Sequence, residues 1–149
     1  MLSRQASHAL KALLELAAKP LEWQSTHALA TAQHLPEPML EQLLLRLRRA
    51  GLLDARRGRV GGYRLTRPAR DISMDQILTG LGEALRNNPN RSEPLEPASS
   101  PADQVTYALQ LRLERVRQKA LAELSLEDLL FDLRSAVAGS DGEVGVMLG

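Results

Sequence analysis

Residues 36–67, PEPMLEQLLLRLRRAGLLDARRGRVGGYRLTR, contain the pattern that decides the fold. The first half predicts a helix over residues 37–50, with Pro38 in the first turn and Gly51 as the C-terminal cap. Its apolar side chains recur at helical spacing, at Leu40, Leu43, Leu44 and Leu47. The opposite side of this helix is polar and basic, which is typical of a helix with one buried and one exposed face.

The second half of this stretch predicts a β-hairpin. Residues 52–55 form a short strand, residues 63–66 alternate as a returning strand, and the glycine-rich basic loop 56–62 joins them. Glycines allow such a tip to approach a groove or a backbone closely, and arginine is the side chain that a narrow, electronegative minor groove attracts. A basic hairpin directly after a basic helix is typical of a wing.

The charge is concentrated in the same region. Residues 46–70 hold nine arginines and one acid, a local charge of +8, although the whole chain carries only +1. Residues 1–45 sum to −1 and residues 71–149 to −6. A solvated face is the alternative, but arginine without lysine favours phosphate and base-edge contacts. The pattern therefore indicates nucleic-acid binding.

The residues before this stretch complete a helix-turn-helix. A first helix is predicted over residues 4–18 with Ser3 as its cap, and a second over residues 26–33 capped by Ser25. A tight turn at residues 34–36 leads into the basic helix. Two helices joined by so short a turn, the second with a basic outer face, match the helix-turn-helix pattern.

The residues after it predict an appended helical element. A helix over residues 73–85 opens on a capping box of Ser73 and Gln76, and residues 86–102 form a Pro-, Ser- and Asn-rich loop. A long amphipathic helix follows over residues 103–124. Its stripe resembles a coiled-coil seam and predicts a homodimer interface, with packing inside one chain as the alternative. The stripe consists of Val105, Leu109, Leu113, Val116, Ala120 and Leu124.

A short last helix over residues 126–133 and a flexible, glycine-containing tail end the chain. We therefore expect a mainly α fold with a small β-hairpin wing, a winged helix-turn-helix followed by a long C-terminal dimerisation helix. The expected units are a DNA-binding domain (1–85), a loop (86–102), the dimerisation and terminal helices (103–134) and a tail (135–149).

Composition excludes several classes of protein. There is no cysteine, so disulfides, thiolate metal sites and cysteine-ligated iron–sulfur clusters are ruled out. No signal peptide or membrane span is predicted, which makes a cytoplasmic protein the expectation. The three histidines, His8, His27 and His34, show neither metal-ligand spacing nor a nucleophile beside a base, so an enzyme is not expected.

Five segments in order resemble one known family: MLEQLL (39–44), LRRAGLL (47–53), RGRVGGYRL (57–65), ISMDQI (72–77) and LSLEDLL (124–130). Over about residues 2–134 the chain resembles the Rrf-type (IscR/NsrR/CymR-like) winged helix-turn-helix transcriptional regulators. The resemblance implies a homodimer on a two-fold operator in double-stranded DNA. It implies that the basic helix enters the major groove, where Gln42 reads bases and Glu41 penalises some of them.

By the same resemblance, Arg57 or Arg59 enters the minor groove, and phosphates are contacted or supported by Ser3, Arg4, Gln5 and Tyr63. The remaining expected DNA-binding positions are Pro38, Met39, Arg46, Arg49, Gly61 and Gly62.

The chain departs from the family at the sensor loop, where cluster-binding members carry three cysteines. Glu93, Glu96 and Asp103 are oxygen-bearing side chains in or beside that loop, but solvated acids are the favoured interpretation. No cofactor is predicted, and a protein or small-molecule effector stays open. The alternative to a DNA-binding regulator is a protein-interaction adaptor that retains the fold with weak DNA binding.

Overall fold

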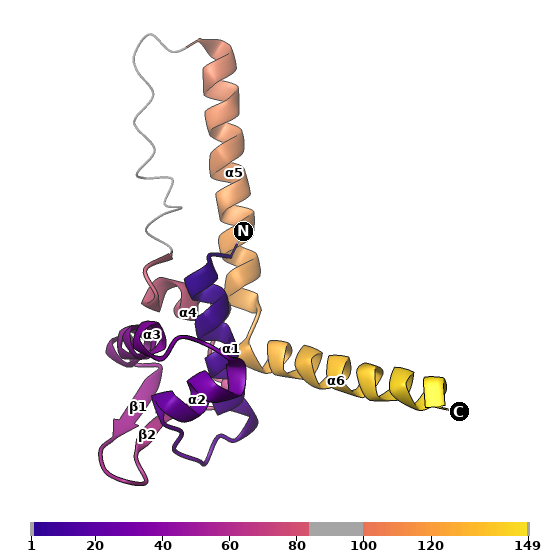
Figure 1. The fold of residues 1–149 in the computed structure, drawn as a ribbon. Helices are drawn as coiled ribbons and strands as arrows, with labels where there is room; N and C mark the ends of the chain where they lie inside the picture. The colour runs from indigo at the N-terminus through magenta and orange to yellow at the C-terminus, as the bar shows by residue number, and fades with distance from the viewer. Residues whose placement is uncertain (1, 84–99, 149) are drawn as a thin grey trace.

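The computed structural model describes residues 2–83 and 100–148 (Figure 1). In chain order its elements are α1 (Arg4–Ala18), α2 (Thr26–Gln33), α3 (Glu37–Arg49), β1 (Leu53–Arg56), β2 (Gly62–Leu65), the 3-10 turn η1 (Ala69–Asp71), α4 (Met74–Gly80), α5 (Pro101–Glu123) and α6 (Leu126–Leu148). The expected fold class, mainly helical with one two-stranded antiparallel hairpin, is confirmed.

The first three helices begin and end where local signals predict. The Ser3 hydroxyl accepts the Ala6 N–H at 3.0 Å, and the Ser25 hydroxyl accepts the Ala28 N–H at 3.0 Å. His34 ends α2 in the left-handed conformation, with φ 54° and ψ 48°. Few residues other than glycine adopt this conformation, and histidine is among the more tolerant. It turns the chain directly into α3, which has no side-chain cap because Pro36 precedes it.

The hairpin pairs β1 with β2 in the register Leu53↔Leu65 to Arg56↔Gly62. Both strands lie one residue away from their predicted bounds. Gly51, at φ +81°, allows the Leu52 N–H to reach the Leu47 carbonyl at 3.0 Å and close the end of α3. Leu52 therefore belongs to the helix cap, and β1 begins at the next residue.

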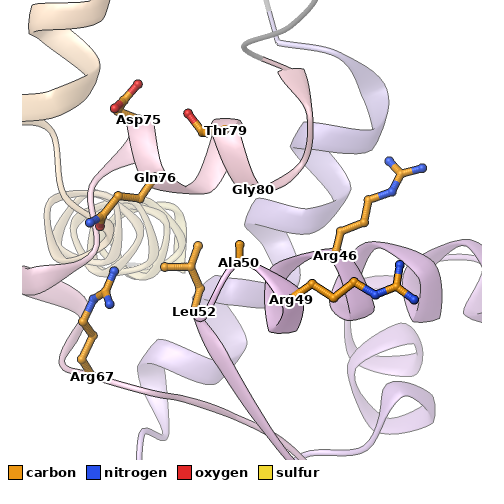
Figure 2. A pocket seen from close by; sticks show the side chains of 9 residues that line it. All are labelled: Arg46, Arg49, Ala50, Leu52, Arg67, Asp75, Gln76, Thr79 and Gly80. Carbon is orange, nitrogen blue, oxygen red and sulfur yellow. The ribbon is translucent and has the colours of Figure 1, made fainter.

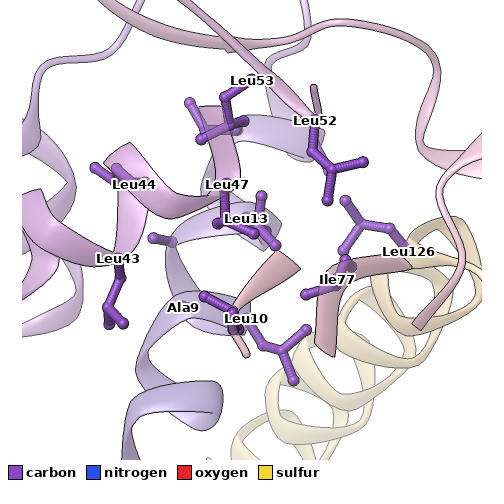
Figure 3. Packing of buried hydrophobic residues seen from close by; sticks show 14 of the residues in the cluster. Ala9, Leu10, Leu13, Leu43, Leu44, Leu47, Leu52, Leu53, Ile77 and Leu126 are labelled. Atoms are coloured by element: carbon purple, nitrogen blue, oxygen red, sulfur yellow. The ribbon is translucent and has the colours of Figure 1, made fainter. Parts of the chain in front are cut away.

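The core is built almost entirely from leucine and alanine (Figure 3). Leu13 of α1, Leu47 of α3 and Ile77 of α4 meet there, together with Leu126 from the start of α6. Each of these side chains is fully buried, which stabilises the fold by about 1.5–3 kcal/mol per residue. Leu126 therefore anchors the C-terminal helices to the core formed with α1, α3 and α4.

Backbone hydrogen bonds fix the corner between α5 and α6. The Met74 N–H donates to the Leu124 carbonyl and the Leu126 N–H donates to the Ile72 carbonyl, each at 2.8 Å. Ser125 and Asp128 form a reciprocal cap at the start of α6. The two helices leave this corner in different directions, and most of each projects away from the domain (Figure 1).

Two predicted boundaries, the end of α4 and the start of α5, differ from the structure. The helix expected over 73–85 ends at Gly80, because Gly82 adopts φ +81° and turns the chain; residues 84 and 85 lie outside the described part. The loop expected over 86–102 ends before Ser100, which caps α5, so Pro101 and Ala102 are already helical. The rest of that loop, residues 84–99, is not described.

The prediction of a helix ending at residue 133 and a flexible tail over 135–149 was wrong for the described residues. One helix, α6, runs through to Leu148. A glycine inside a helix costs only about 1 kcal/mol relative to alanine, and no proline follows Pro101. The glycines were therefore a weaker stop signal than expected. In the described part of the chain, no helix is both long and apolar enough to cross a bilayer.

Candidate DNA-binding surface

Helix α3 buries one face and exposes the residues expected to contact DNA. Leu40, Leu43, Leu44 and Leu47 are buried, whereas the other side is open to solvent. Of the predicted DNA-binding residues on α3, Pro38, Gln42, Arg46 and Arg49 are exposed, and Met39 and Glu41 are half-buried. The exposed side divides into two edges, one toward the wing and one toward α4.

The edge toward the wing borders an open groove of about 400 Å³. This groove brings together the start of α2, the Glu41 side of α3 and the tip of the hairpin. Its lining consists of Ser25, Thr26, Glu41, Leu45, Arg48, Ala55, Arg56, Arg57, Gly58, Arg59, Gly61, Gly62 and Tyr63. Of these residues, Glu41, Arg57, Arg59, Gly61, Gly62 and Tyr63 were predicted from sequence. The groove also contains Arg48 and Arg56, which brings its arginines to four.

The other edge carries Arg46 and Arg49. Their side chains extend in the same direction from α3, away from Arg67 (Figure 2). Both border an open hollow of about 580 Å³ between the end of α3 and α4. Arg46 also shares a neighbouring hollow with Gln5 of α1. Two predicted residues, Gln5 of α1 and Arg46 of α3, therefore meet on this side, away from the wing.

Glu41 is a structural acceptor that joins three elements. The Thr26 hydroxyl of α2 donates to its Oε2, and the Tyr63 hydroxyl of β2 donates to its Oε1 at 3.0 Å. Both carboxylate oxygens therefore have donors within the protein. This arrangement differs from the predicted role, in which a free Glu41 carboxylate would face the bases.

Tyr63 is buried, and this burial is the main cause that raises the pKa of its phenol to about 12. The hydrogen bond to Glu41 and the negative charge of that carboxylate raise the pKa further, while the positive charge of Arg48 lowers it. The phenol therefore stays protonated and keeps donating to Glu41. Tyr63 therefore stabilises the groove through its hydrogen bond to Glu41, since little of its side chain reaches solvent.

The wing glycines are required by the protein's own backbone. A Cβ on Gly61 would lie 2.2 Å from the Arg56 carbonyl oxygen, and a Cβ on Gly62 would lie 2.3 Å from the Gln24 carbonyl. Gly62 also has φ +143°. The reason is a bridge in which Gln24 and Tyr63 exchange backbone hydrogen bonds of 3.0 and 2.8 Å. Only the tip glycine, Gly58, leaves open space around it.

The N-terminal residues divide into structural and exposed ones. Ser3 caps α1 and also donates its hydroxyl to Glu83 Oε1, so its side chain is already engaged. Arg4 and Gln5 are exposed in the first turn of α1. Of the three predicted N-terminal residues, these two therefore have side chains that can reach a ligand.

Several basic and aromatic residues at the surface were not singled out from sequence. Arg48 and Arg56 line the groove, and Arg56 and Arg64 approach the ring of Trp23. All three arginines lie in the basic segment, so their charge was visible. Their positions relative to Trp23 could not be predicted, because Trp23 lies beside the hairpin as a result of the Gln24–Tyr63 bridge, which joins residues far apart in the sequence.

The stripe on α5 is uncovered in the single chain. Val105, Leu109, Leu113 and Val116 are each more than half exposed, and Leu124 is 38% exposed. Ala120 is exposed as well, and no side chain of α5 is buried. The half-buried residues of this helix, such as Leu111 and Leu121, lie on its other side.

A helix-turn-helix followed directly by a basic β-hairpin defines a winged-helix protein. The Rrf2 family profile, described as iron-dependent transcriptional regulator, matches residues 2–132, and the chain belongs to this family. It is 39% identical over 135 residues to slr0846 of Synechocystis sp., assigned as an HTH-type transcriptional regulator, with 90% of each chain covered.

Solved structures agree with this assignment. T. potens IscR superposes with a TM-score of 0.71 at 29% identity, covering 91% of this chain and 90% of that one. CymR, the global cysteine regulator of B. subtilis, gives 0.70 at 29% identity, covering 87% and 95%. The relatives are transcriptional regulators and the family is not enzymatic. The predicted family is therefore confirmed.

The iron dependence in the family description does not fit this chain as a cysteine-ligated cluster, because the sequence contains no cysteine. Within the described ranges, no three His, Asp or Glu side chains are grouped so that they could hold a metal ion. Asp103 caps α5, and its hydrogen bonds from Ser100 lower the pKa of its carboxyl group. Glu93 and Glu96 lie outside the described residues.

Proposed function

We propose that this chain is a sequence-specific DNA-binding regulator that acts as a homodimer on a two-fold operator, without a cysteine-ligated cluster. The observation that carries the proposal is the groove between α3 and the wing, where Arg48, Arg56, Arg57 and Arg59 converge beside the exposed face of α3. Four guanidinium groups along one groove suit a phosphate backbone, because arginine binds phosphate through paired N–H donors.

The two edges of α3 support a docking in which the helix lies in the major groove. The wing edge would face one strand and place Arg57 or Arg59 toward the minor groove. The other edge, with Arg46, Arg49 and the start of α1, would face the opposite strand. Gln42 is exposed in the same helical row as Arg46 and Arg49, four and seven positions before them, and is the best-placed base reader on α3.

Glu41 acts in this proposal by holding the wing and not by reading bases. Its carboxylate accepts hydrogen bonds from Thr26 and Tyr63, so turning it toward DNA would leave the buried Tyr63 hydroxyl without a partner. Glu41 therefore sets the width of the groove between α3 and β2.

The uncovered stripe on α5 supports the homodimer. Side chains as large as Leu109 and Leu113 are rarely left exposed in a continuous row unless another surface covers them. Packing against the same helix of a second copy would bury the stripe through a seam of the coiled-coil type. Two DNA-binding domains related by that axis would match a two-fold operator.

The experiment that tests this function is to sequence genomic fragments retained by the purified protein and then titrate the enriched duplex at several salt concentrations. The expected result is tight, salt-dependent binding to a two-fold sequence. Gln42→Ala should relax the preference, whereas Arg59→Ala should weaken binding to every duplex and flatten the salt slope. Equal affinity for enriched and random DNA would contradict sequence-specific binding and favour the adaptor alternative.

A further inference from the structure

The outer face of the wing carries a stacked pair that the proposed function does not use. The guanidinium carbon of Arg64 lies 4.3 Å from the centroid of the Trp23 ring, and that of Arg56 lies 5.9 Å from it. Trp23 belongs to the link between α1 and α2 and directly precedes Gln24, which bridges to Tyr63. The bridge therefore holds the indole against the hairpin.

The hairpin register places both arginines on one face. Arg56 pairs with Gly62 and Arg64 pairs with Asp54, so Asp54, Arg56 and Arg64 point to the same side. The other side carries Leu53, Tyr63 and Leu65, which are buried. The outer face of the wing is thus basic, and Trp23 is the aromatic side chain that covers it.

The stack leaves the hydrogen-bonding edge of Arg64 available. A guanidinium on an aromatic ring contacts it through its flat face, while its five N–H donors lie in the plane of the group. Within residues 2–83 and 100–148, the Arg64 side chain forms no hydrogen bond or ion pair, although Asp54 lies directly across from it on β1. Such a pre-oriented fork suits a phosphate, which accepts paired N–H bonds.

This face continues into the groove described above. Arg56 borders that groove and also approaches Trp23, and Ser25, two residues after Trp23, lines the groove as well. We propose that Arg64, held on the Trp23 ring and flanked by Arg56, binds a phosphate of duplex DNA beside the wing groove. Trp23 is then a positioning residue. This inference rests on the proposed DNA binding.

The first test compares Arg64→Ala with Arg70→Ala, a matched loss of one charge from an exposed arginine on η1 outside the wing. With the full-length protein and the enriched duplex, Arg64→Ala should weaken binding about tenfold, equally for all sequences, and lower the salt slope by about one contact. Arg70→Ala should change the affinity and the salt slope much less. Equal losses in the two variants would overturn the phosphate contact.

The second test separates the role of Trp23 from simple packing. Trp23→Phe keeps an aromatic face and should retain most of the affinity, whereas Trp23→Leu should lose nearly as much as Arg64→Ala. Thermal unfolding of each variant checks that the domain remains folded. Equal affinities for the Phe and Leu variants would overturn the positioning role.

Trp23 is the only tryptophan of the chain, so its fluorescence reports on this site alone. Saturation with the duplex, followed independently by anisotropy of labelled DNA, should change the indole emission. Unchanged emission at full occupancy would overturn the proposed site while leaving the proposed function intact. If the wild-type protein does not bind DNA at all, the proposed function fails and this inference fails with it.

Discussion

The Tyr63 hydroxyl donates to Glu41 Oε1 at 3.0 Å and thereby ties the wing to the helix that is expected to enter the major groove. The two residues come from different elements, β2 and α3, and lie 22 positions apart. Thr26 brings α2 into the same network through the other oxygen of Glu41. The carboxylate thus fixes the relative placement of α2, α3 and β2.

Tyr63→Phe should lower the free energy of unfolding by about 1–3 kcal/mol, because a buried hydrogen bond to a carboxylate is lost. The wild-type protein should also lose stability as the pH rises from about 10, the usual tyrosine value, through about 12, the pKa of Tyr63 in the fold. A raised pKa stabilises the fold only while the phenol is protonated. Denaturant unfolding at a series of pH values should therefore show a shallower loss for Tyr63→Phe; identical slopes would contradict this account.

Glu41→Ala should weaken binding to all duplexes to a similar extent and leave the preferred sequence unchanged, since the wing is no longer held against α3. Gln42→Ala is the comparison, because it should remove about 1–3 kcal/mol of discrimination at a single base pair. Binding measured across a library of operator variants distinguishes the two. A change of preferred base in Glu41→Ala would restore the base-reading role expected from sequence.

Gly62→Ala should destabilise the protein by more than about 2 kcal/mol, because the new Cβ would meet the Gln24 carbonyl and the residue would keep a left-handed backbone. Gly58→Ala is the matched control, since it has φ +111° but open space around it. Thermal unfolding should show the larger loss for Gly62→Ala. Equal losses would mean that backbone conformation alone accounts for both glycines.

Leu113→Glu should convert a dimer into a folded monomer, because it places a charge in the middle of the α5 stripe and α5 contributes no buried side chain to the domain core. Gln118→Glu introduces the same residue on another side of the helix and should leave the dimer intact. Light scattering after size exclusion gives the mass of each variant. A wild-type monomer, or a Leu113→Glu dimer, would contradict the α5 interface.

Gly139→Ala should stabilise α6 by up to about 1 kcal/mol and raise the helical content. The position lies inside the helix, has no left-handed backbone and has open space for a methyl group. Circular dichroism and thermal unfolding measure the effect. No gain in helicity would indicate that the segment after Leu133 is not helical in solution, as the sequence had suggested.

Much of the fold could be predicted from the sequence because the signals for it are local. The serine caps of α1 and α2, the leucine stripe of α3 and the glycine end of that helix all act within a few residues. The basic segment likewise predicted nucleic-acid binding, since the charge of a segment can be counted from its sequence without knowing the fold. The polar face of α3 and the apolar stripe of α5 follow from periodicity alone, whereas the exposure of that stripe is seen only in the structure.

The sequence by itself therefore determined the elements up to α5, their order and the apolar stripe of α5, and it predicted a nucleic-acid ligand. Only the tertiary structure decided which side chains act together: that Glu41 accepts from Thr26 and Tyr63, that Gly62 is needed beside Gln24, and that Trp23 holds Arg64. These contacts join residues far apart in the chain, and their partners depend on how α2, α3 and the hairpin pack. Local periodicity carries no information about that packing.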